Sequence, residues 1–206
     1  MRLLPVLLLA ACSAERAAPG PPLPAPVLIG KVEEGAEMLG TKPPPLDVEW
    51  LDGEAHPLED DRGKVVLVRW WTDTCPLCAN SAKAVAALKA KHGDRLVVRA
   101  VYHEKVRGRR VDAARAADMA RDVGFPYLVG IDRGWAALRR WWLDGGRRSY
   151  TSVSFLLGPD GRGAAIHTGG EFHARDQVAA DACLFTPEAC AADYEALDRA
   201  IAALAR

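Results

Sequence analysis

The sequence predicts an α/β protein with a mixed central sheet that helices cover on both faces. Apolar runs of strand length, rich in β-branched residues, alternate with helical segments over most of the chain. A helix follows each of the first three core runs, as expected for parallel strands joined by crossovers. The turn Pro159-Asp160-Gly161 joins the last two runs and indicates an antiparallel hairpin.

The predicted elements follow one another in a regular order. Strands are expected over residues 65–71, 96–102, 127–131, 153–157 and 163–167, and helices over residues 79–91, 111–123, 135–142 and 191–205. Gly93 and Gly124 stop the first two helices. Before the first core strand, residues 46–51 and the pair Asp52-Gly53 indicate a short N-terminal hairpin.

The first residues resemble a secretory leader. Met1-Arg2 precedes an apolar run, residues 3–9, which is too short to cross a bilayer as a mature helix. Leu9-Ala10-Ala11-Cys12 is similar to the lipobox of bacterial lipoproteins. We therefore expect residues 1–11 to be a lipoprotein signal peptide and Cys12 to carry lipid; an ordinary signal peptide that contains a cysteine is the alternative.

The rest of the chain divides by composition. Residues 12–42 comprise the lipidated cysteine and a linker rich in proline and alanine, and residues 43–206 are expected to form the domain, with a C-terminal extension over about residues 171–206. The 27 basic and 27 acidic residues cancel, so bulk charge does not predict a nucleic-acid partner.

The pair Cys75 and Cys78 carries the predicted chemistry. Cys75 follows the first core strand and begins a helix, where the helix dipole and unpaired N–H groups stabilise a thiolate. Pro76 suits the first turn because it has no N–H and fixes its own φ. Cys78, one turn later, is close enough to resolve a mixed disulfide formed at Cys75. The pattern predicts dithiol–disulfide exchange.

Two further cysteines, Cys183 and Cys190, lie near the C-terminus. In an oxidising compartment they are expected to form a structural disulfide that closes a short loop. A second redox pair or a set of metal ligands is the alternative.

Several stretches resemble thioredoxin-fold thiol-disulfide oxidoreductases of the extracytoplasmic TlpA/ResA branch. They are Arg62-Gly63-Lys64 before the core strand, Trp71, the motif Cys75-Pro76-Leu77-Cys78, and residues 155–161. The resemblance covers about residues 43–170. It implies a thioredoxin-like three-layer fold with an added N-terminal hairpin, no cofactor, and a location in the bacterial cell envelope. It also implies protein thiols and disulfides as clients, a membrane or soluble redox donor, and attachment to the membrane through the lipid.

The resemblance also assigns neighbours to the dithiol and shows two departures. The proline that relatives place beside the dithiol in a cis peptide falls on Ser152, next to Thr151. A serine there is expected to keep the turn with a trans bond, because a cis bond is costly without proline. Arg69 stands where relatives have a buried Asp or Asn. It lowers the thiol pKa if it faces the sulfurs, and has no effect if it extends to the surface.

Other functions fit the same residues less well. Cys75 and Cys78 with His103, His167 or His173 could bind copper or zinc, although His167 and His173 are expected to be solvated. Thr72-Asp73-Thr74-Cys75 matches the Thr-x-x-Cys of peroxiredoxins, and a binding module with a vestigial site is a further alternative. Two more expectations are structural: Glu104 is a surface acid, and Trp135, Trp141 and Trp142 pack in the core.

Overall fold

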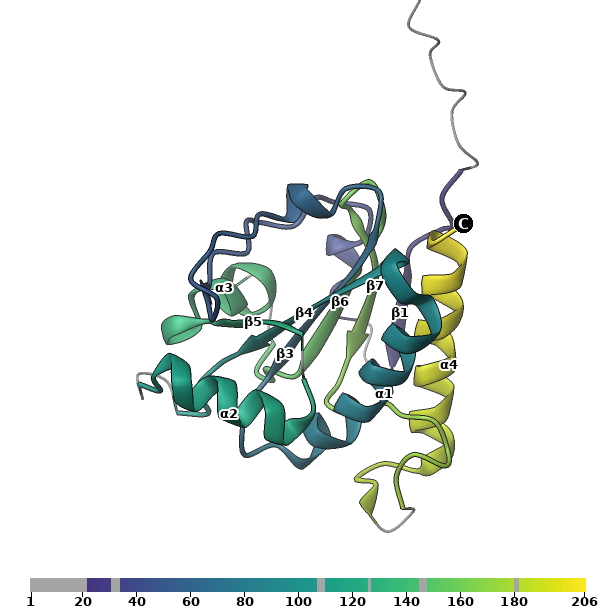
Figure 1. Ribbon diagram of the computed structural model, residues 1–206. Coiled ribbons are helices and arrows are strands. Elements are labelled where there is room, and N and C mark those ends of the chain that lie inside the picture. Colours follow the sequence, from purple (N-terminus) through teal and green to yellow (C-terminus); the bar gives the residue numbers. More distant parts are fainter. Residues whose placement is uncertain (1–21, 31–33, 107–109, 126, 145–147, 180–181) are drawn as a thin grey trace, which may run out of the picture.

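A seven-stranded mixed sheet forms the centre of the protein (Figure 1). The structure is a computed structural model, and it describes residues 22–30, 34–106, 110–125, 127–144, 148–179 and 182–206. The strand order is β1-β7-β6-β3-β4-β5-β2. The strands are β1 Val27–Gly30, β2 Glu49–Trp50, β3 Val65–Trp71, β4 Leu96–Tyr102, β5 Leu128–Ile131, β6 Val153–Leu157 and β7 Gly163–Thr168.

The pairing confirms the predicted mixed sheet. Strand β3 is parallel to β4, and β4 is parallel to β5. Strand β6 is antiparallel to both β3 and β7, so the predicted C-terminal hairpin is present. The helices are α1 Pro76–His92, α2 Ala113–Val123, the short α3 Ala136–Leu138 with a π turn over Arg139–Leu143, and α4 Pro187–Leu204.

Helices cover both faces of the sheet, as predicted. All seven residues of β3 are buried because alternate side chains enter two separate cores. Val65 and Leu67 pack with α1, α2 and α4, whereas Val66 and Val68 pack with the tryptophan-rich segment around α3. Helices α1 and α4 lie side by side on one face (Figure 1).

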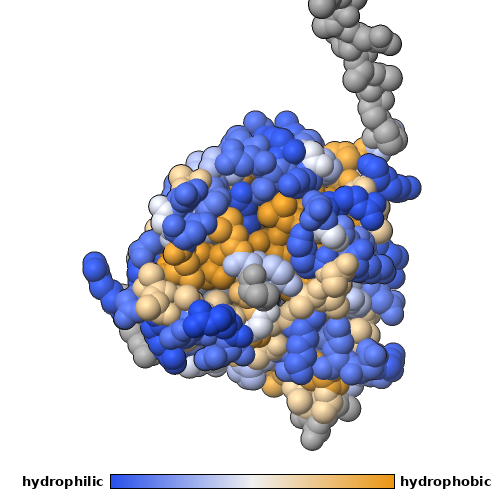
Figure 2. Space-filling view, viewed as in Figure 1, coloured by the Kyte–Doolittle hydropathy of each residue, from blue (hydrophilic) through white to orange (hydrophobic). Residues whose placement is uncertain are grey.

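The core on the α3 face is aromatic. Trp141 and Trp142 are fully buried and pack edge-on against Phe155, which confirms their predicted place in the core. The view in Figure 2 shows apolar side chains gathered over the middle of the sheet, with hydrophilic ones around them. Among the described residues, no helix is both long and apolar enough to cross a membrane.

The N-terminal part of the domain differs from the prediction in two ways. The expected linker, residues 12–42, supplies β1, which is parallel to β7 at the sheet edge. The expected hairpin is wrong, because β2 pairs antiparallel with β5 and the chain after it forms a 3₁₀ turn, Leu58–Asp61. An edge strand needs only a partner with free backbone groups, and β5 supplies one from far along the chain. Residues 1–11 and Cys12 lie outside the described residues.

Candidate active site

The N-terminus of α1 places the sulfurs of Cys75 and Cys78 together. Cys75 has an extended backbone and caps the helix, and Pro76 occupies the first helical position as predicted. The Cys78 N–H donates a hydrogen bond to Cys75 Sγ over 3.3 Å. The side chain of Cys75 is half-buried, whereas Cys78 is fully buried behind it. The outer sulfur can therefore meet a partner while the inner one is shielded.

The environment of Cys75 favours its thiolate. Its pKa is lowered to about 6, chiefly by a hydrogen bond from the Cys78 thiol, with burial acting in the opposite direction. The Cys78 N–H, the positive charge of Arg69 and the Ser152 hydroxyl lower it further. A thiol with this pKa is mostly ionised at neutral pH, so Cys75 is nucleophilic there.

The environment of Cys78 has the opposite effect. The pKa of its thiol is raised, first because its proton is held by the hydrogen bond to Cys75 and second because the side chain is buried. Arg69 opposes this shift without reversing it. The dithiol therefore carries one negative charge at neutral pH, and that charge lies on the exposed sulfur.

Arg69 lies under the dithiol and does not extend to the surface. The alternation of β3 puts it on the α1 face with Trp71, and the side chain is fully buried. Its guanidinium donates to the Gly169 carbonyl at 3.1 Å and the Gly170 carbonyl at 2.6 Å, and also to the Ser154 hydroxyl at 3.1 Å. Burial lowers the pKa of this guanidinium and the two thiols raise it.

The other predicted neighbours divide into two groups. Thr151 and Ser152 are half-buried before β6, and every described peptide bond is trans, as expected without the family's proline. Trp71 is fully buried and packs against Tyr102 and Phe125, with ring centroids 5.1 and 5.4 Å away. Trp71 is therefore part of the core that packs beneath the start of α1.

The structure adds two residues that the sequence analysis missed. The Ser81 hydroxyl of α1 lies 2.8 Å from the Gly170 carbonyl, the same carbonyl that Arg69 binds. Position 170 has no room for a side chain, because a Cβ there would lie 2.7 Å from Leu77 Cδ1. The pair Gly169-Gly170 after β7 was the one available signal for this close approach.

Three polar side chains expected at the surface are buried. His167 is 1% exposed, burial lowers its pKa, and its ring meets Phe172 at 4.9 Å. His173 is fully buried, and Glu104 is 2% exposed beside Arg133 at 3.7 Å. The prediction of solvated side chains was wrong because distant elements supply their partners and exclude water. His103 is also buried, which lowers its pKa to about 4.

These histidines do not complete a metal site at the dithiol. Among the described residues, the His, Cys, Asp and Glu side chains close enough to share an ion are Glu171, His173 and Cys190, without Cys75 or Cys78. Cys183 lies nearby, with its Sγ 3.2 Å from His173 Nε2.

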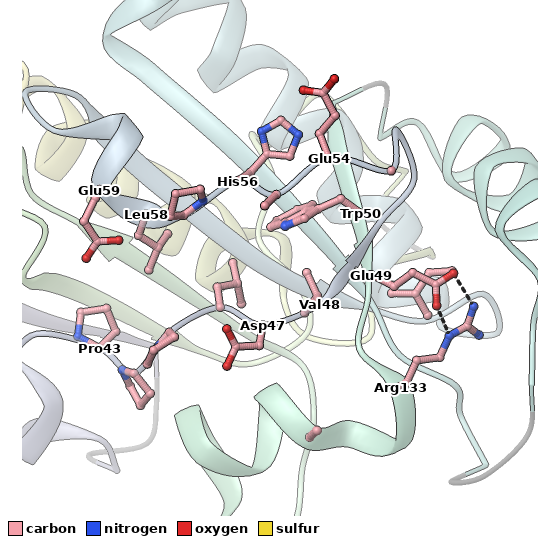
Figure 3. Close-up of a pocket in the computed structure, with 18 residues that line it drawn as sticks. Pro43, Asp47, Val48, Glu49, Trp50, Glu54, His56, Leu58, Glu59 and Arg133 are labelled. Carbon is pink, nitrogen blue, oxygen red and sulfur yellow. Dashed lines mark hydrogen bonds and ion pairs between the residues drawn. The ribbon is translucent and has the colours of Figure 1, made fainter.

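A separate pocket of about 740 Å³ lies beside β2 (Figure 3). The segment 43–59 forms most of its wall, with Trp50 and His56 among the lining side chains. Glu49 closes one end through a two-pronged ion pair with Arg133, at 2.8 and 2.9 Å. The lining does not include Cys75 or Cys78, so this pocket is not the dithiol site.

The structure combines a mixed sheet, covered by helices on both faces, with a Cys-x-x-Cys pair at the start of a helix. No protein-family model matches the chain. A 90-residue stretch, 44% of the chain, is 30% identical to the thioredoxin-like protein YneN of Bacillus subtilis. That match covers 52% of YneN, so the chain spans about half the length of this curated relative.

Solved structures give the same fold over most of the chain. A candidate thiol:disulfide interchange protein DsbE from Chlorobium tepidum superposes with a TM-score of 0.59 and 23% identity, covering 82% of this chain and 98% of that one. A candidate protein disulfide isomerase from Bacteroides thetaiotaomicron superposes with a TM-score of 0.58 and 17% identity, covering 81% and 89%. The protein therefore has a thioredoxin-like fold.

Proposed function

We propose that this protein is a thiol-disulfide oxidoreductase that exchanges disulfides with other proteins through Cys75 and Cys78. One observation carries the proposal: a half-buried thiol at the start of α1, with a pKa of about 6, is backed by a buried thiol whose pKa is raised. The names of the proteins with similar folds support it, as does the resemblance of the motif to the TlpA/ResA branch.

The first step is attack by the Cys75 thiolate on a client disulfide. A bond forms between Cys75 Sγ and one client sulfur, and the client S–S bond breaks. The other client sulfur leaves as a thiolate and takes a proton from water. The Cys78 N–H and thiol, which stabilise the thiolate before the attack, hold Cys75 Sγ at the helix end.

The second step resolves the mixed disulfide. Once Cys75 is bonded to the client it no longer carries a negative charge, so the largest cause of the raised Cys78 pKa disappears. Cys78 then loses its proton to solvent and attacks Cys75 Sγ, and the client leaves with its second thiol. The client gains two electrons and two protons, and the protein keeps a Cys75–Cys78 disulfide that a redox donor must reduce.

Reduction of client disulfides is the direction that we propose. A thiolate that is strongly stabilised makes its couple oxidising, as in DsbA with a cysteine pKa of about 3.5. The Cys75 pKa of about 6 is closer to the value of about 7 in thioredoxin. We expect a reduction potential nearer to the roughly −270 mV of thioredoxin than to the roughly −120 mV of DsbA.

The tether belongs to the same proposal. The lipobox-like Leu9-Ala10-Ala11-Cys12 supports lipid attachment at Cys12 and a location in the bacterial cell envelope, facing the periplasm or the outer surface. Extracytoplasmic proteins are then the clients, and a membrane or soluble protein is the redox donor. Incorporation of labelled palmitate in the bacterial host, abolished by Cys12→Ala, tests the anchor; equal labelling of the variant contradicts it.

An insulin assay tests the exchange activity. The protein should accelerate the reduction of insulin by dithiothreitol, and Cys75→Ser should abolish that acceleration. Cys78→Ser should instead accumulate a mixed disulfide between Cys75 and an insulin chain, because the resolving thiol is missing. The two variants are matched controls for each other. Absence of acceleration by the wild-type protein contradicts the proposal.

A peroxidase is less consistent with the site. The hydroxyl of Thr72, which the peroxiredoxin-like motif would direct at the cysteine, lies 3.2 Å from the Asp73 carboxylate. Val68, at the position of the motif's proline, faces the α3 core on the opposite side of the sheet from Cys75.

A further inference from the structure

The C-terminal extension gathers four side chains that bind metals in other proteins: Glu171, His173, Cys183 and Cys190. We call them the extension cluster. We propose that the extension cluster is a four-coordinate site for zinc or a similar divalent ion, separate from the dithiol. One nitrogen, one oxygen and two sulfurs form a donor set that zinc accepts.

The distances between donors fit one shared ion. One ligand atom each from Glu171, His173 and Cys190 lie within 4.8 Å of one another. His173 Nε2 is 3.5 Å from Glu171 Oε1 and 3.2 Å from Cys183 Sγ. Around a tetrahedral zinc ion, with bonds of about 2.1 Å to N and O and about 2.3 Å to S, these separations should be about 3.4 and 3.6 Å. The His173 nitrogen therefore needs only small movements relative to Glu171 and Cys183. The Cys183 sulfur lies outside the group of ligand atoms that are all within 4.8 Å of one another, so it must move toward that group to become the fourth ligand.

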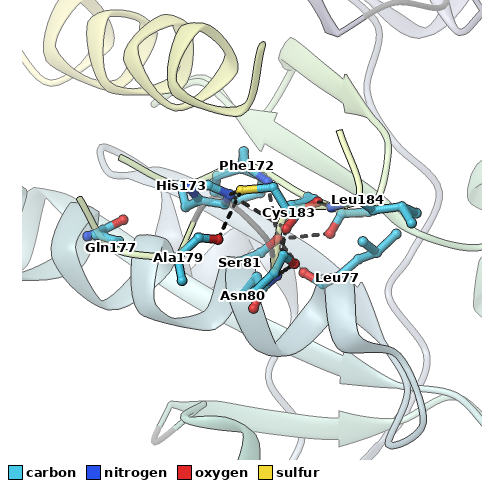
Figure 4. Close-up of polar contacts among 12 residues, drawn as sticks. Leu77, Asn80, Ser81, Phe172, His173, Gln177, Ala179, Cys183 and Leu184 are labelled. Atoms are coloured by element: carbon cyan, nitrogen blue, oxygen red, sulfur yellow. Dashed lines mark hydrogen bonds and ion pairs between the residues drawn. The ribbon is translucent and has the colours of Figure 1, made fainter. Parts of the chain in front are cut away.

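The histidine is already held in the form that a metal requires. Its Nδ1 lies 3.0 Å from the Ala174 carbonyl, and a carbonyl can only accept, so Nδ1 carries a proton. In the neutral ring the lone pair is then on Nε2, the atom that faces Cys183 and Glu171. In most metal-binding histidines, the ring nitrogen that does not bind the metal donates a hydrogen bond of this kind, and that bond fixes the tautomer. Figure 4 shows His173 facing Cys183.

The carboxylate is held in the same way. Glu171 is 2% exposed, and its two oxygens accept from Asn80 Nδ2 at 2.6 Å and from the Leu184 N–H at 3.0 Å. Within the described part of the chain, the basic group in ion-pair range of Glu171 is His173. A buried carboxylate needs hydrogen-bond donors or a cation beside it, and a metal ion bonded to a Glu171 oxygen would be such a cation.

A disulfide between Cys183 and Cys190, which the sequence predicts, is the alternative state of the two sulfurs. It would join the two sulfurs without giving a role to the histidine nitrogen and the carboxylate oxygens beside them. Binding of zinc uses all four donors and involves no electron transfer: the two thiols release their protons to solvent as the metal–sulfur bonds form.

The proposed site would fix the extension against the active-site helix. Asn80, two residues after Cys78 on α1, donates to Glu171 and also to the Ala182 carbonyl at 3.1 Å. Cys190 lies in the first turn of α4, and the His173 N–H donates to its carbonyl at 3.3 Å. An ion at the extension cluster would therefore join α1, α4 and the segment between β7 and α4.

Cobalt titration tests the proposal. The full chain with Cys75→Ser and Cys78→Ser excludes binding by the dithiol, so the result is independent of the proposed exchange activity. After reduction and anaerobic removal of the reductant, one Co²⁺ per chain should bind with the intense visible bands of tetrahedral coordination and a sulfur-to-cobalt charge-transfer band. Zn²⁺ should displace it and raise the melting temperature.

Variants separate a built site from adventitious binding. In the same background, His173→Gln or Cys190→Ser should abolish the tetrahedral spectrum, and Asn80→Ala should weaken Co²⁺ binding by about 10- to 100-fold. His56→Gln, a histidine outside the extension cluster, is the matched control and should bind normally. Absence of a tetrahedral spectrum in the parent protein, whose folding circular dichroism verifies, overturns the proposal. A spectrum that His173→Gln and Cys190→Ser leave unchanged also overturns it.

Discussion

Replacing Cys78 by alanine removes the largest single cause that lowers the pKa of Cys75. The backbone N–H that donates to Cys75 Sγ over 3.3 Å remains, but the thiol donor is lost. A hydrogen bond to a charged group contributes about 1.5–3 kcal/mol, and one pKa unit corresponds to about 1.4 kcal/mol. The loss is therefore about 1 to 2 units, and we expect about 1 unit because solvent screens the half-buried Cys75.

Cys78→Ser is the matched control. Its hydroxyl can still donate to the Cys75 thiolate, so the Cys75 pKa should stay closer to the wild-type value of about 6. The comparison thus separates loss of the donor from loss of the sulfur, which both variants share.

Alkylation kinetics measure the effect. The rate at which iodoacetamide modifies the Cys75 peptide, followed by mass spectrometry against pH, reports the thiolate fraction. A pKa that moves from about 6 to about 7 lowers that fraction at pH 7 from about nine tenths to about one half, so Cys78→Ala should react about two-fold more slowly than wild type. A Cys78→Ala profile that keeps the wild-type midpoint would contradict this prediction. A midpoint that shifts as far in Cys78→Ser as in Cys78→Ala would contradict it as well.

Three further outcomes are expected. Because Cys75 ionises near pH 6 and the Cys78 thiol stays protonated, the reduction potential of the Cys75–Cys78 couple should fall by about 59 mV per pH unit below pH 6 and by about 30 mV per pH unit above it. Equilibration with glutathione measures this potential. A constant slope up to pH 8 would contradict the ionisation of Cys75 near pH 6. Arg69→Met should raise the Cys75 pKa, but by less than Cys78→Ala does, because the charge of Arg69 is a smaller cause than the hydrogen bond from Cys78. Arg69→Lys keeps the positive charge and should leave the Cys75 pKa unchanged. The pH dependence of the alkylation rate measures both effects. Trp70→Phe should lower the free energy of unfolding in urea by about 1 kcal/mol more than Trp71→Phe does. The Trp70 indole N–H donates to the buried Asp132 carboxylate at 3.3 Å, whereas the Trp71 N–H has no hydrogen-bond partner among the described residues. Equal losses would contradict this prediction.

The long strands and helices were predictable from the sequence because each carries its own signal. β3, β4 and β6 have the bounds that the apolar runs predict, and α2 begins two residues after its predicted start. The short edge strands carry no such signal. β1 has four residues and β2 has two, so neither shows a period, and their existence depends on partners that are distant in sequence.

Buried polar residues were the main error of the sequence analysis. His167, His173 and Glu104 were expected in solvent because polar side chains are costly to bury. Their burial depends on compensating groups on other elements, such as Asp193, whose carboxylate lies 3.3 Å from His167 Nε2, or Arg133 beside Glu104. A single sequence does not show which polar groups will meet.

The sequence by itself determined the position of Cys75 at the start of a helix that follows a buried strand, because strand, cap and helix signals are all local. It also determined that Cys78 lies one turn behind. Only the tertiary structure decided that Arg69 stays under the dithiol, where carbonyls from residues 169 and 170 hold it. It also decided that Glu171 and His173 meet two cysteines beside α1. The physical reason is that the charge, burial and hydrogen bonding of a side chain depend on atoms from distant parts of the chain.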